Sequence, residues 1–399
     1  MTARRSLASS GSALALVALL LGTGCDFSAA APAELDPALV GKGKTIFRSD
    51  TYGDETFWTD TLRMHEVIAG GVSPRTALSV GLKVDMDTLP QGVRDAIAAG
   101  QVNLDDPATT VTLLKLGAVV GVVGQVDASN HLTRVGITCA LCHSTVDNSF
   151  APGIGHRLDG WPNRDLNVGA IVALSPVLPA AAKAVYNGWG PGMYDPRFNL
   201  DGKNMPVVIP PAFGLRHVAR EVYTGDDTVS YWNLYVGVTQ MHGHGAFADA
   251  RIGVNVQNPP DNLTAAKLSA LRAYQFSLDK PTASGFDAAA AARGKVVFDG
   301  VGKCASCHAG AEFTDVNSGV LHTAAEVGQD PAYAARSATG KYRTTPLRGL
   351  YHPPQLTGPY FHDGAATTLA AAVDHYIATL RLTLTAQQKA DLVEYLKTL

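Results

Sequence analysis

The stretch TCALCHST, residues Thr138 to Thr145, places two cysteines and a histidine within five positions of a 399-residue chain. Three kinds of site use this pattern or part of it: a redox dithiol, half of a zinc site and a covalent haem attachment point. The rest of the chain decides between them.

A second copy of the motif, CASCH, lies at Cys304, Cys307 and His308. The one other cysteine, Cys25, falls in an N-terminal leader, so none is left for a structural disulfide. A thioredoxin-like dithiol sits in a β-α-β context and needs no following histidine, and zinc needs a partnered Cys/His set. Two Cys-x-x-Cys-His copies in an exported chain favour c-type haem, with thioethers and iron ligands supplied by Cys139, Cys142 and His143 and by Cys304, Cys307 and His308.

The N-terminus has the features of an export signal. Arg4 and Arg5 precede a short apolar run, Leu14 to Leu21, and Cys25 stands where a lipoprotein cysteine would lie. Cleavage near SAAAP, which would discard Cys25, is the alternative. We therefore expect a signal peptide over residues 1–25, a linker over 26–40 and a periplasmic protein, either released or anchored through Cys25.

The bulk composition indicates a large globular protein. Apolar residues make up 46% of the chain, enough for a sizeable core, and the formal net charge is −3. No run of basic residues stands out, which argues against nucleic acid as a partner.

The two halves share an outline. GKTIF at 43–47 resembles GKVVF at 294–298, and LTAAKLSALRAY at 263–274 resembles LTAQQKADLVEY at 384–395. Each half thus orders a Gly-Lys helix, a Cys-x-x-Cys-His motif and a closing helix. Thr264 and Thr385 are the expected helix caps, the latter in a capping box with Gln388.

This outline predicts a mainly α fold with two cytochrome c-like haem domains, residues 41–280 and 281–399. Gly43 precedes Cys139 by 96 residues, whereas Gly294 precedes Cys304 by 10, so about 86 residues are inserted into the first domain. DKPTASG at 279–285 is the expected linker between the domains.

The segment RTTPLRGLYHPPQLTGPYFHDGAATTLAAAVDHY at 343–376 resembles the C-terminal haem domain of bacterial di-haem cytochrome c peroxidases and MauG-type enzymes. NMPVVIPPAF at 204–213 and VTQMHG at 238–243 are similar to landmarks of the same family. Two parts of the first half, the segment ITCALCHSTVDNSFAPGIGHRLDGWPNRDLNVGA at 137–170 and the large insertion, look nearer to a divergent branch, the rubber-oxygenase-like proteins.

The resemblance implies two covalent haems, with electrons relayed from the C-terminal haem to a reactive N-terminal haem that handles peroxide or oxygen. It also implies a small redox protein, a cytochrome or a cupredoxin, as electron donor or acceptor. Two alternatives stay open: a pure electron-transfer di-haem cytochrome, and a haem oxygenase acting on an apolar substrate.

For the C-terminal haem, the resemblance places the sixth iron ligand at Tyr376, fourteen residues after His362. His375 would also be a good ligand. Adjacent helical residues point about 100° apart, and Tyr376 falls on the apolar stripe formed with Leu369, Val373, Ile377 and Leu380. Arg348 and Arg343 are the candidates for binding haem propionates.

For the N-terminal haem, Gln240 stands where peroxidases of this family have a glutamate, and an amide cannot shuttle a proton. The candidate distal residues are therefore Gln240, His242, His244 and His156. The resemblance also implies an aromatic side chain between the haems, for which Tyr223 and Trp232 are the candidates. It further implies a calcium ion between the domains, with oxygen ligands from Asn204, Thr357 and the backbone of Pro359.

Overall fold

The computed structural model describes residues 35–399. The expected signal peptide and Cys25 lie outside this range. The first helix, α1 (Pro37–Ser49), begins inside the segment expected to be a linker, so that expectation is wrong for its last four residues. The reason is local: Asp36 accepts a hydrogen bond from the amide of Ala38, and Pro37 occupies the first helical turn.

Helices dominate the structure, and short 3-10 or π turns (η) lie between them. Before the first motif come α1, η1 (Thr56–Thr61), α2 (Met64–Gly71), α3 (Pro74–Ser79), η2 (Met86–Thr88), α4 (Gln91–Ala98) and α5 (Pro107–Lys115). From the first motif to the second come α6 (Ala140–His143), α7 (Val168–Ala173), α8 (Ala180–Asn187), α9 (Phe198–Asp201), α10 (Val229–Thr239), η3 (Ala250–Ile252), η4 (Ala265–Lys267), α11 (Leu268–Phe276) and α12 (Ala288–Asp299). The last are η5 (Cys304–Ser306), η6 (Val316–Ser318), α13 (Ala324–Val327), α14 (Pro331–Ala334), α15 (Leu369–Thr379) and α16 (Ala386–Leu396).

The strands form two-stranded pairs, which the expectation of a mainly α fold did not include. Antiparallel pairs are β2 (Val122–Val126) with β3 (Leu132–Ile137), β4 (Ser144–Val146) with β6 (Arg157–Asp159), β7 (Met193–Tyr194) with β8 (Val207–Val208), and β9 (Ala246–Asp249) with β10 (Val254–Gln257). The parallel pair is β1 (Val84–Asp85) with β5 (Ile154–Gly155).

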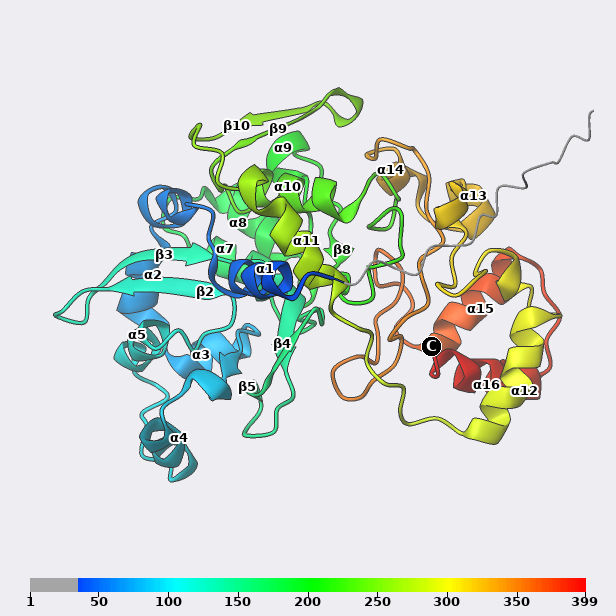
Figure 1. Cartoon of the computed structure of the whole chain (residues 1–399), viewed down its shortest axis with the longest axis horizontal. Coiled ribbons are helices and arrows are strands. Elements are labelled where there is room, and N and C mark those ends of the chain that lie inside the picture. The colour runs from blue at the N-terminus through cyan, green and yellow to red at the C-terminus, as the bar shows by residue number, and fades with distance from the viewer. Residues whose placement is uncertain (1–34) are drawn as a thin grey trace, which may run out of the picture. The chain divides into compact units, whose positions relative to one another are not determined.

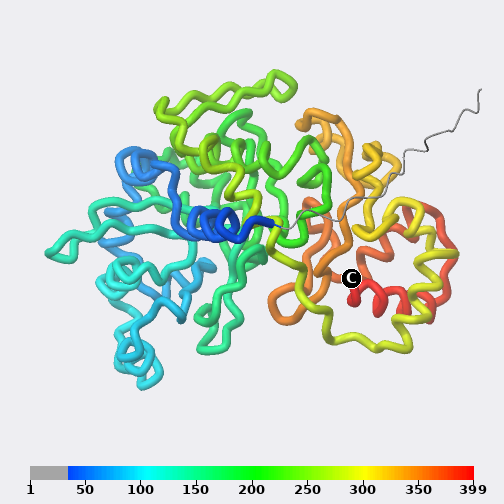
Figure 2. Tube along the Cα trace, in the orientation of Figure 1, coloured from blue at the N-terminus to red at the C-terminus, as the bar shows by residue number. Residues whose placement is uncertain are grey.

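The repeated sequence folds into a repeated packing unit. Helix α1 crosses α11 in the first half, and α12 crosses α16 in the second, where the yellow and red helices lie side by side (Figures 1 and 2). At both crossings a glycine meets the backbone of the partner helix. A Cβ at Gly43 would collide with the carbonyl of Ala270, and one at Gly294 with the carbonyl of Asp391.

An aromatic pair stabilises each crossing. Phe47 meets Tyr274 edge-on with ring centroids 5.5 Å apart, and Phe298 meets Tyr395 in the same way at 5.2 Å. The closing helices begin differently. The capping box of Thr385 and Gln388 is confirmed, but the Thr264 cap is wrong because its hydroxyl donates to the carbonyl of His244 instead.

The inserted elements build additional apolar cores beside the first crossing. One centres on Trp58, Leu62 and Leu166, and a second on Leu89, Leu113 and Leu114. In Figure 1 these elements and the β2–β3 hairpin occupy the region coloured blue to cyan, for which the second half has no counterpart.

A buried arginine joins the two halves of the chain. Arg336, just beyond α14, donates to both carboxylate oxygens of Asp195 at 3.0–3.1 Å and to both of Asp201 at 2.9–3.0 Å. The side chains of Arg336 and Asp195 are 3% and 0% exposed. Residues 278–287, which connect α11 to α12, contain no helix or strand. Within residues 35–399 no helix is both long and apolar enough to span a bilayer.

Candidate haem sites and their shared cavity

Both Cys-x-x-Cys-His motifs lie on the wall of one large cavity. Its volume is about 1050 Å³, and its lining includes Cys139, Cys142, His143, Cys304, Cys307 and His308. Ligand pockets are typically about 300–1,000 Å³, so this cavity is at or above the upper end of that range. Most of the remaining wall is apolar, as a porphyrin requires.

The two motif histidines are oriented in the same way. Nδ1 of His143 lies 3.1 Å from the carbonyl oxygen of Pro210, and Nδ1 of His308 lies 2.9 Å from that of Phe313. A proton donated from Nδ1 to a carbonyl leaves the lone pair on Nε2, the usual arrangement of an iron-ligating histidine. Burial lowers the pKa of His143 to about 4 and also lowers that of His308, so both imidazoles are neutral, as ligands must be.

The cysteines do not fit a redox dithiol. Burial raises the pKa of the free thiol to about 11 for Cys139 and Cys304 and to about 12 for Cys142. Reactive dithiols have a lowered pKa, because the thiolate is the nucleophile. These surroundings therefore favour an uncharged sulfur, which a thioether is.

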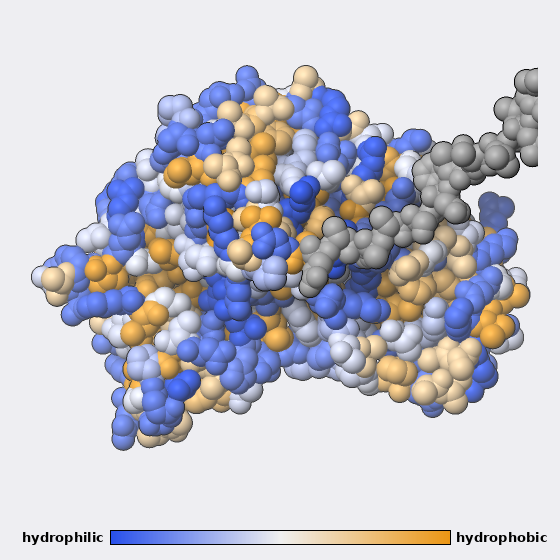
Figure 3. Space-filling model, viewed as in Figure 1, coloured by the Kyte–Doolittle hydropathy of each residue, from blue (hydrophilic) through white to orange (hydrophobic). Residues whose placement is uncertain are grey.

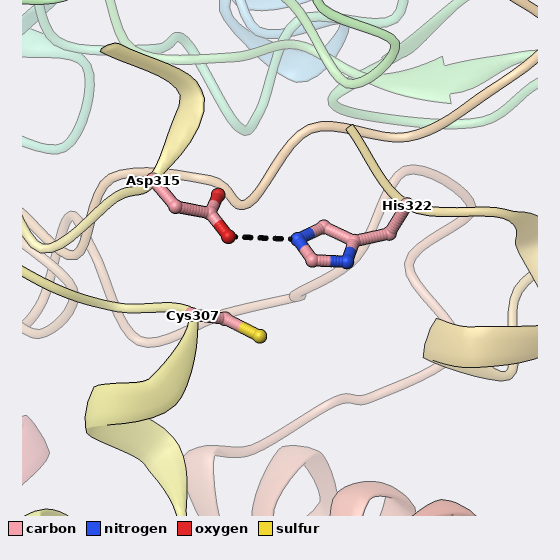
Figure 4. A group of neighbouring side chains, drawn as sticks. All are labelled: Cys307, Asp315 and His322. Carbon is pink, nitrogen blue, oxygen red and sulfur yellow. Dashed lines mark hydrogen bonds and ion pairs between the residues drawn. The ribbon is translucent and has the colours of Figure 1, made fainter. Parts of the chain in front are cut away.

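A zinc site is not formed either. Among residues 35–399, one group of metal-type donors comes together: Cys307, Asp315 and His322, within 4.8 Å of one another (Figure 4). Asp315 and His322 pair with each other at 2.9 Å, and the hydroxyl of Thr344 is 3.0 Å from the same His322 nitrogen. Cys304 does not join the group, so the four-ligand set of a structural zinc is incomplete.

A buried arginine provides an independent test of whether haem fits. Arg164 lines the cavity, and its Nε and Nη1 atoms are buried without a hydrogen-bond partner. An unpaired buried guanidinium is costly, and a haem propionate is the kind of carboxylate that would satisfy it. The residues present therefore fit the group. Arg164 was not among the predicted site residues, because nothing in its local sequence indicates that it is buried.

The two arginines expected to bind propionates also line the cavity. Arg343 is paired with Glu221 at 3.1 Å and Arg348 contacts Glu312. Both thus already have a carboxylate partner, whereas Arg164 has none among the described residues.

Tyr376 and His375 point in different directions, as the 100° rotation between adjacent helical residues predicted. Tyr376 lines the cavity, and the structure shows no hydrogen bond to its hydroxyl from any described residue. Burial, followed by the nearby Cys307 and Cys304, raises its pKa to about 12. His375 is not part of the cavity wall, and its Nε2 lies 2.8 Å from the carbonyl of Val327.

Gln240 lines the cavity, and both ends of its side-chain amide are hydrogen-bonded to other residues. It is buried at the C-terminus of α10, where Tyr194 donates to its Oε1 at 2.6 Å. Its Nε2 donates to Asn199 at 3.1 Å and to Thr239 at 3.0 Å. The side chain is therefore held in place and has no spare donor for a ligand.

Of the three candidate histidines, one lines the cavity and two do not. His242 lines the cavity, stacks on Phe57 at 3.5 Å and has a pKa lowered to about 4 by burial. His244 pairs with Asp261 at 2.7 Å, and His156 is exposed and pairs with Asp87 at 2.9 Å. Neither His244 nor His156 lines the cavity, so the structure does not bring them to the haem site.

The two candidate bridge residues both line the cavity. Tyr223 lies where the halves meet: its hydroxyl donates to Val208, its carbonyl accepts from the amide of Arg343, and its ring is 6.2 Å from that of His362. Trp232 belongs to an aromatic core of the first half with Tyr235 and Phe247. Of the two, Tyr223 has the more suitable position.

The positions expected to bind calcium are near the surface. Asn204 and Thr357 are exposed, and the Asn204 oxygen accepts a hydrogen bond from Trp189 at 2.8 Å. The carboxylates of the adjoining loop, Asp195 and Asp201, are already paired with Arg336. Calcium takes six to eight oxygen ligands, of which these residues supply few, so calcium binding stays a prediction.

A comparison with protein-family models gives a match in the second half of the chain. The cytochrome c family model matches residues 291–399. The methylamine utilization protein MauG of Methylorubrum extorquens is 34% identical over 108 residues, which cover 26% of this chain and 28% of MauG. The match thus spans less than a third of either protein.

Two solved structures share a weaker likeness. Hydrazine synthase of Kuenenia stuttgartiensis is 20% identical with a TM-score of 0.34, covering 49% of this chain and 72% of that one. A MauG-like protein associated with microbial copper homeostasis is 20% identical with a TM-score of 0.33, covering 49% and 74%.

The family match and the oriented His308 fall on the same segment. That segment carries Cys304 and Cys307, the two cysteines of its CASCH motif. Residues 291–399 therefore form a cytochrome c domain, and part of the chain is similar to MauG.

Proposed function

We propose that the chain is a di-haem c-type oxidoreductase, with haems attached at Cys139/Cys142 and at Cys304/Cys307. The observation that carries the proposal is the matched pair of motif histidines. His143 and His308 each direct Nδ1 at a backbone carbonyl and line the same cavity.

The C-terminal site is the electron-transfer site of this proposal. Tyr376 lines its side of the cavity, and its hydroxyl has no hydrogen-bond partner among residues 35–399, so it would be available as a ligand to the iron of a haem held by His308. A small redox protein, a cytochrome or a cupredoxin, exchanges electrons there. Tyr223 lies between this site and the first half and assists the transfer.

The N-terminal site is the reactive one. Bound haem there supplies redox chemistry on peroxide or oxygen. The protein contributes His242, a neutral imidazole on the cavity wall that can accept or donate a proton. Gln240 positions Tyr194 and leaves proton transfer to His242, while Arg164 holds the haem carboxylate.

Peroxidase activity is the reaction that we expect first, and the periplasm is the expected compartment. A pure electron carrier would need a sixth protein ligand at both irons. Of the candidate histidines, His242 alone lies on the cavity wall of the first half. A role in proton transfer would favour a peroxidase, and a role as iron ligand would favour an electron carrier.

The test is the resting ferric spectrum, followed by turnover with peroxide and a reduced small cytochrome. We expect a mixture of high-spin and low-spin haem, and turnover that falls about 10²–10⁴-fold in His242→Ala, the usual contribution of a positioned acid or base. His244→Ala is the matched control and should turn over as the wild type does. A fully low-spin resting spectrum that becomes half high-spin in His242→Ala would instead make His242 an iron ligand and the protein an electron carrier.

A further inference from the structure

The segment expected to bind calcium between the two halves is held by an arginine of the second half. Asn204 lies in the connection between β7 and β8, residues 195–206, which also contains Asp195 and Asp201. The guanidinium of Arg336 donates to both aspartates and, at 3.3 Å, to the carbonyl oxygen of Lys203. The expected calcium ligand is therefore the next residue after a group that Arg336 already binds.

Both oxygens of the Asp195 carboxylate are engaged. Each accepts one hydrogen bond from Arg336, at 3.0 and 3.1 Å. Oδ1 also accepts the backbone amide of Arg197 at 2.9 Å, and Oδ2 accepts that of Met205 at 2.6 Å. A calcium ligand turns a lone pair toward the ion. At Asp195 this would break hydrogen bonds in a buried place, which is costly.

The other oxygen donors of the connection are engaged as well. Asp201 accepts hydrogen bonds from Arg336 at 2.9 and 3.0 Å, and its Oδ1 also accepts the amide of Lys203 at 2.9 Å. The side-chain oxygen of Asn204 accepts the indole N–H of Trp189 at 2.8 Å. Calcium takes six to eight oxygen ligands, so the connection would have to rearrange in order to hold the ion.

Arg336 supplies the positive charge that a bridging ion would supply. Its Nε, Nη1 and Nη2 atoms all donate to carboxylates, which the planar guanidinium fork matches in geometry. Hydrophilic residues are spread over the face of the molecule in Figure 3, whereas the side chains of Arg336 and Asp195 are 3% and 0% exposed. Buried charges need such pairing.

We propose that the Arg336 guanidinium takes the place of the calcium ion that the resemblance implies, so that a side chain of the protein joins the two halves. Asp195 directly follows Tyr194, and both line the cavity. Arg336 also lines it, three residues after Tyr333, whose ring stacks on His362 at 4.6 Å. The contact thus fixes a wall segment of one half against a wall segment of the other. It does not depend on haem, because every partner belongs to the chain.

The calcium content of the wild-type protein is the first test. The mature, haem-loaded chain should contain far less than one calcium ion per molecule by atomic emission, and its melting temperature should be equal in EDTA and in millimolar calcium chloride. An ion that binds the folded state, supplied at about 100 times its Kd, would raise the melting temperature by a few degrees. One bound calcium ion per chain, or a melting temperature that falls in EDTA, would overturn the inference. This test needs no variant.

Chemical rescue tests the guanidinium itself. Arg336→Ala should lower the melting temperature by several degrees, because buried carboxylates lose their partner. Ethylguanidinium has the atoms that this substitution removes and should restore part of the loss, whereas ethylammonium, which has the charge without the fork, should restore less. Arg293→Ala is the matched control, since Arg293 pairs with Asp391 but is 57% exposed. Equal rescue by the two compounds, or an equal effect of ethylguanidinium on the two variants, would refute the role of the fork.

Calcium should distinguish the variant from the wild type. Arg336→Ala frees oxygens of Asp195, Asp201 and the Lys203 carbonyl, the donor type that calcium prefers. Calcium chloride should therefore raise the melting temperature of Arg336→Ala and leave that of the wild type unchanged. An equal rise in both proteins would contradict the exchange of the ion for the side chain.

Discussion

The two halves of this molecule use one packing unit in two different surroundings. Both cross a Gly-Lys helix with a closing helix through a glycine, and both direct a motif histidine at a carbonyl. Around the second unit, α15 brings Tyr376 to the cavity. Around the first, an insertion brings apolar walls and His242. Under the proposed function, the shared unit would hold each haem, and the different surroundings would allow the two sites to do different work.

Loss of one cysteine pair has the largest expected effect on this comparison. Cys139→Ser with Cys142→Ser, and separately Cys304→Ser with Cys307→Ser, should each remove one covalent haem, because the thioether sulfurs are lost. Mass spectrometry of the mature protein should show two haem additions in the wild type and one in each double variant. A single addition in the wild type would mean that the halves are alike in fold but not in cofactor.

Tyr376→Phe should alter the second half alone. Removing the hydroxyl deprives the iron of its sixth ligand, so the C-terminal haem should become high-spin in the ferric spectrum. His375→Ala is the control, since His375 points to the carbonyl of Val327 and not into the cavity. A spectrum that changes in His375→Ala and not in Tyr376→Phe would reverse the assignment.

Arg336→Met tests how strongly the two halves are joined. Without the guanidinium, Asp195 is a buried carboxylate that has lost its inter-half partner, which typically costs about 3–5 kcal/mol. Arg293→Met is the control: Arg293 pairs with Asp391 but is 57% exposed, and such pairs contribute about 0–1 kcal/mol. The measurement is the free energy of unfolding in denaturant. If Arg336→Met and Arg293→Met each lower that free energy by the same small amount, other contacts hold the halves together.

The glycine crossings should respond alike in both halves. Gly43→Ala and Gly294→Ala each push a methyl group into a backbone carbonyl, so each should lose about 1–3 kcal/mol of stability. Gly41 lies in the same helix as Gly43, and a Cβ added there would meet no atom within 4 Å. Gly41→Ala should therefore raise the free energy of unfolding by about 0.5–1 kcal/mol. Unequal losses at Gly43 and Gly294 would show that the insertion has altered the first crossing.

Much of this comparison could be predicted from the sequence. The repeated GKTIF and GKVVF segments predicted a Gly-Lys helix and a closing helix in each half, because helical spacing is a local feature of the chain. The crossing of the two helices at a glycine was not predicted. The helical stripe placed Tyr376 inward and His375 outward, since that argument needs only 100° per residue. The capping box of Thr385 is likewise a matter of four consecutive residues.

What could not be predicted depends on long-range contacts. Thr264 has the sequence of a cap but donates to His244, twenty residues away. The MHGHG stretch gave no reason to prefer His242 over His244, because Phe57 and Asp261, which contact them, come from elsewhere in the chain. Arg164 was missed for the same reason: its burial is a property of the assembled cavity.

The carbonyls that orient the two motif histidines have a consequence for the order of folding. The carbonyl that orients His308 belongs to Phe313, five residues away, so a short loop closure is enough to set that imidazole. The carbonyl that orients His143 belongs to Pro210, 67 residues away, so a much longer loop must close before that imidazole is oriented. Longer loops close at greater entropic cost and form later. The His308 imidazole should therefore be oriented earlier in folding than the His143 imidazole.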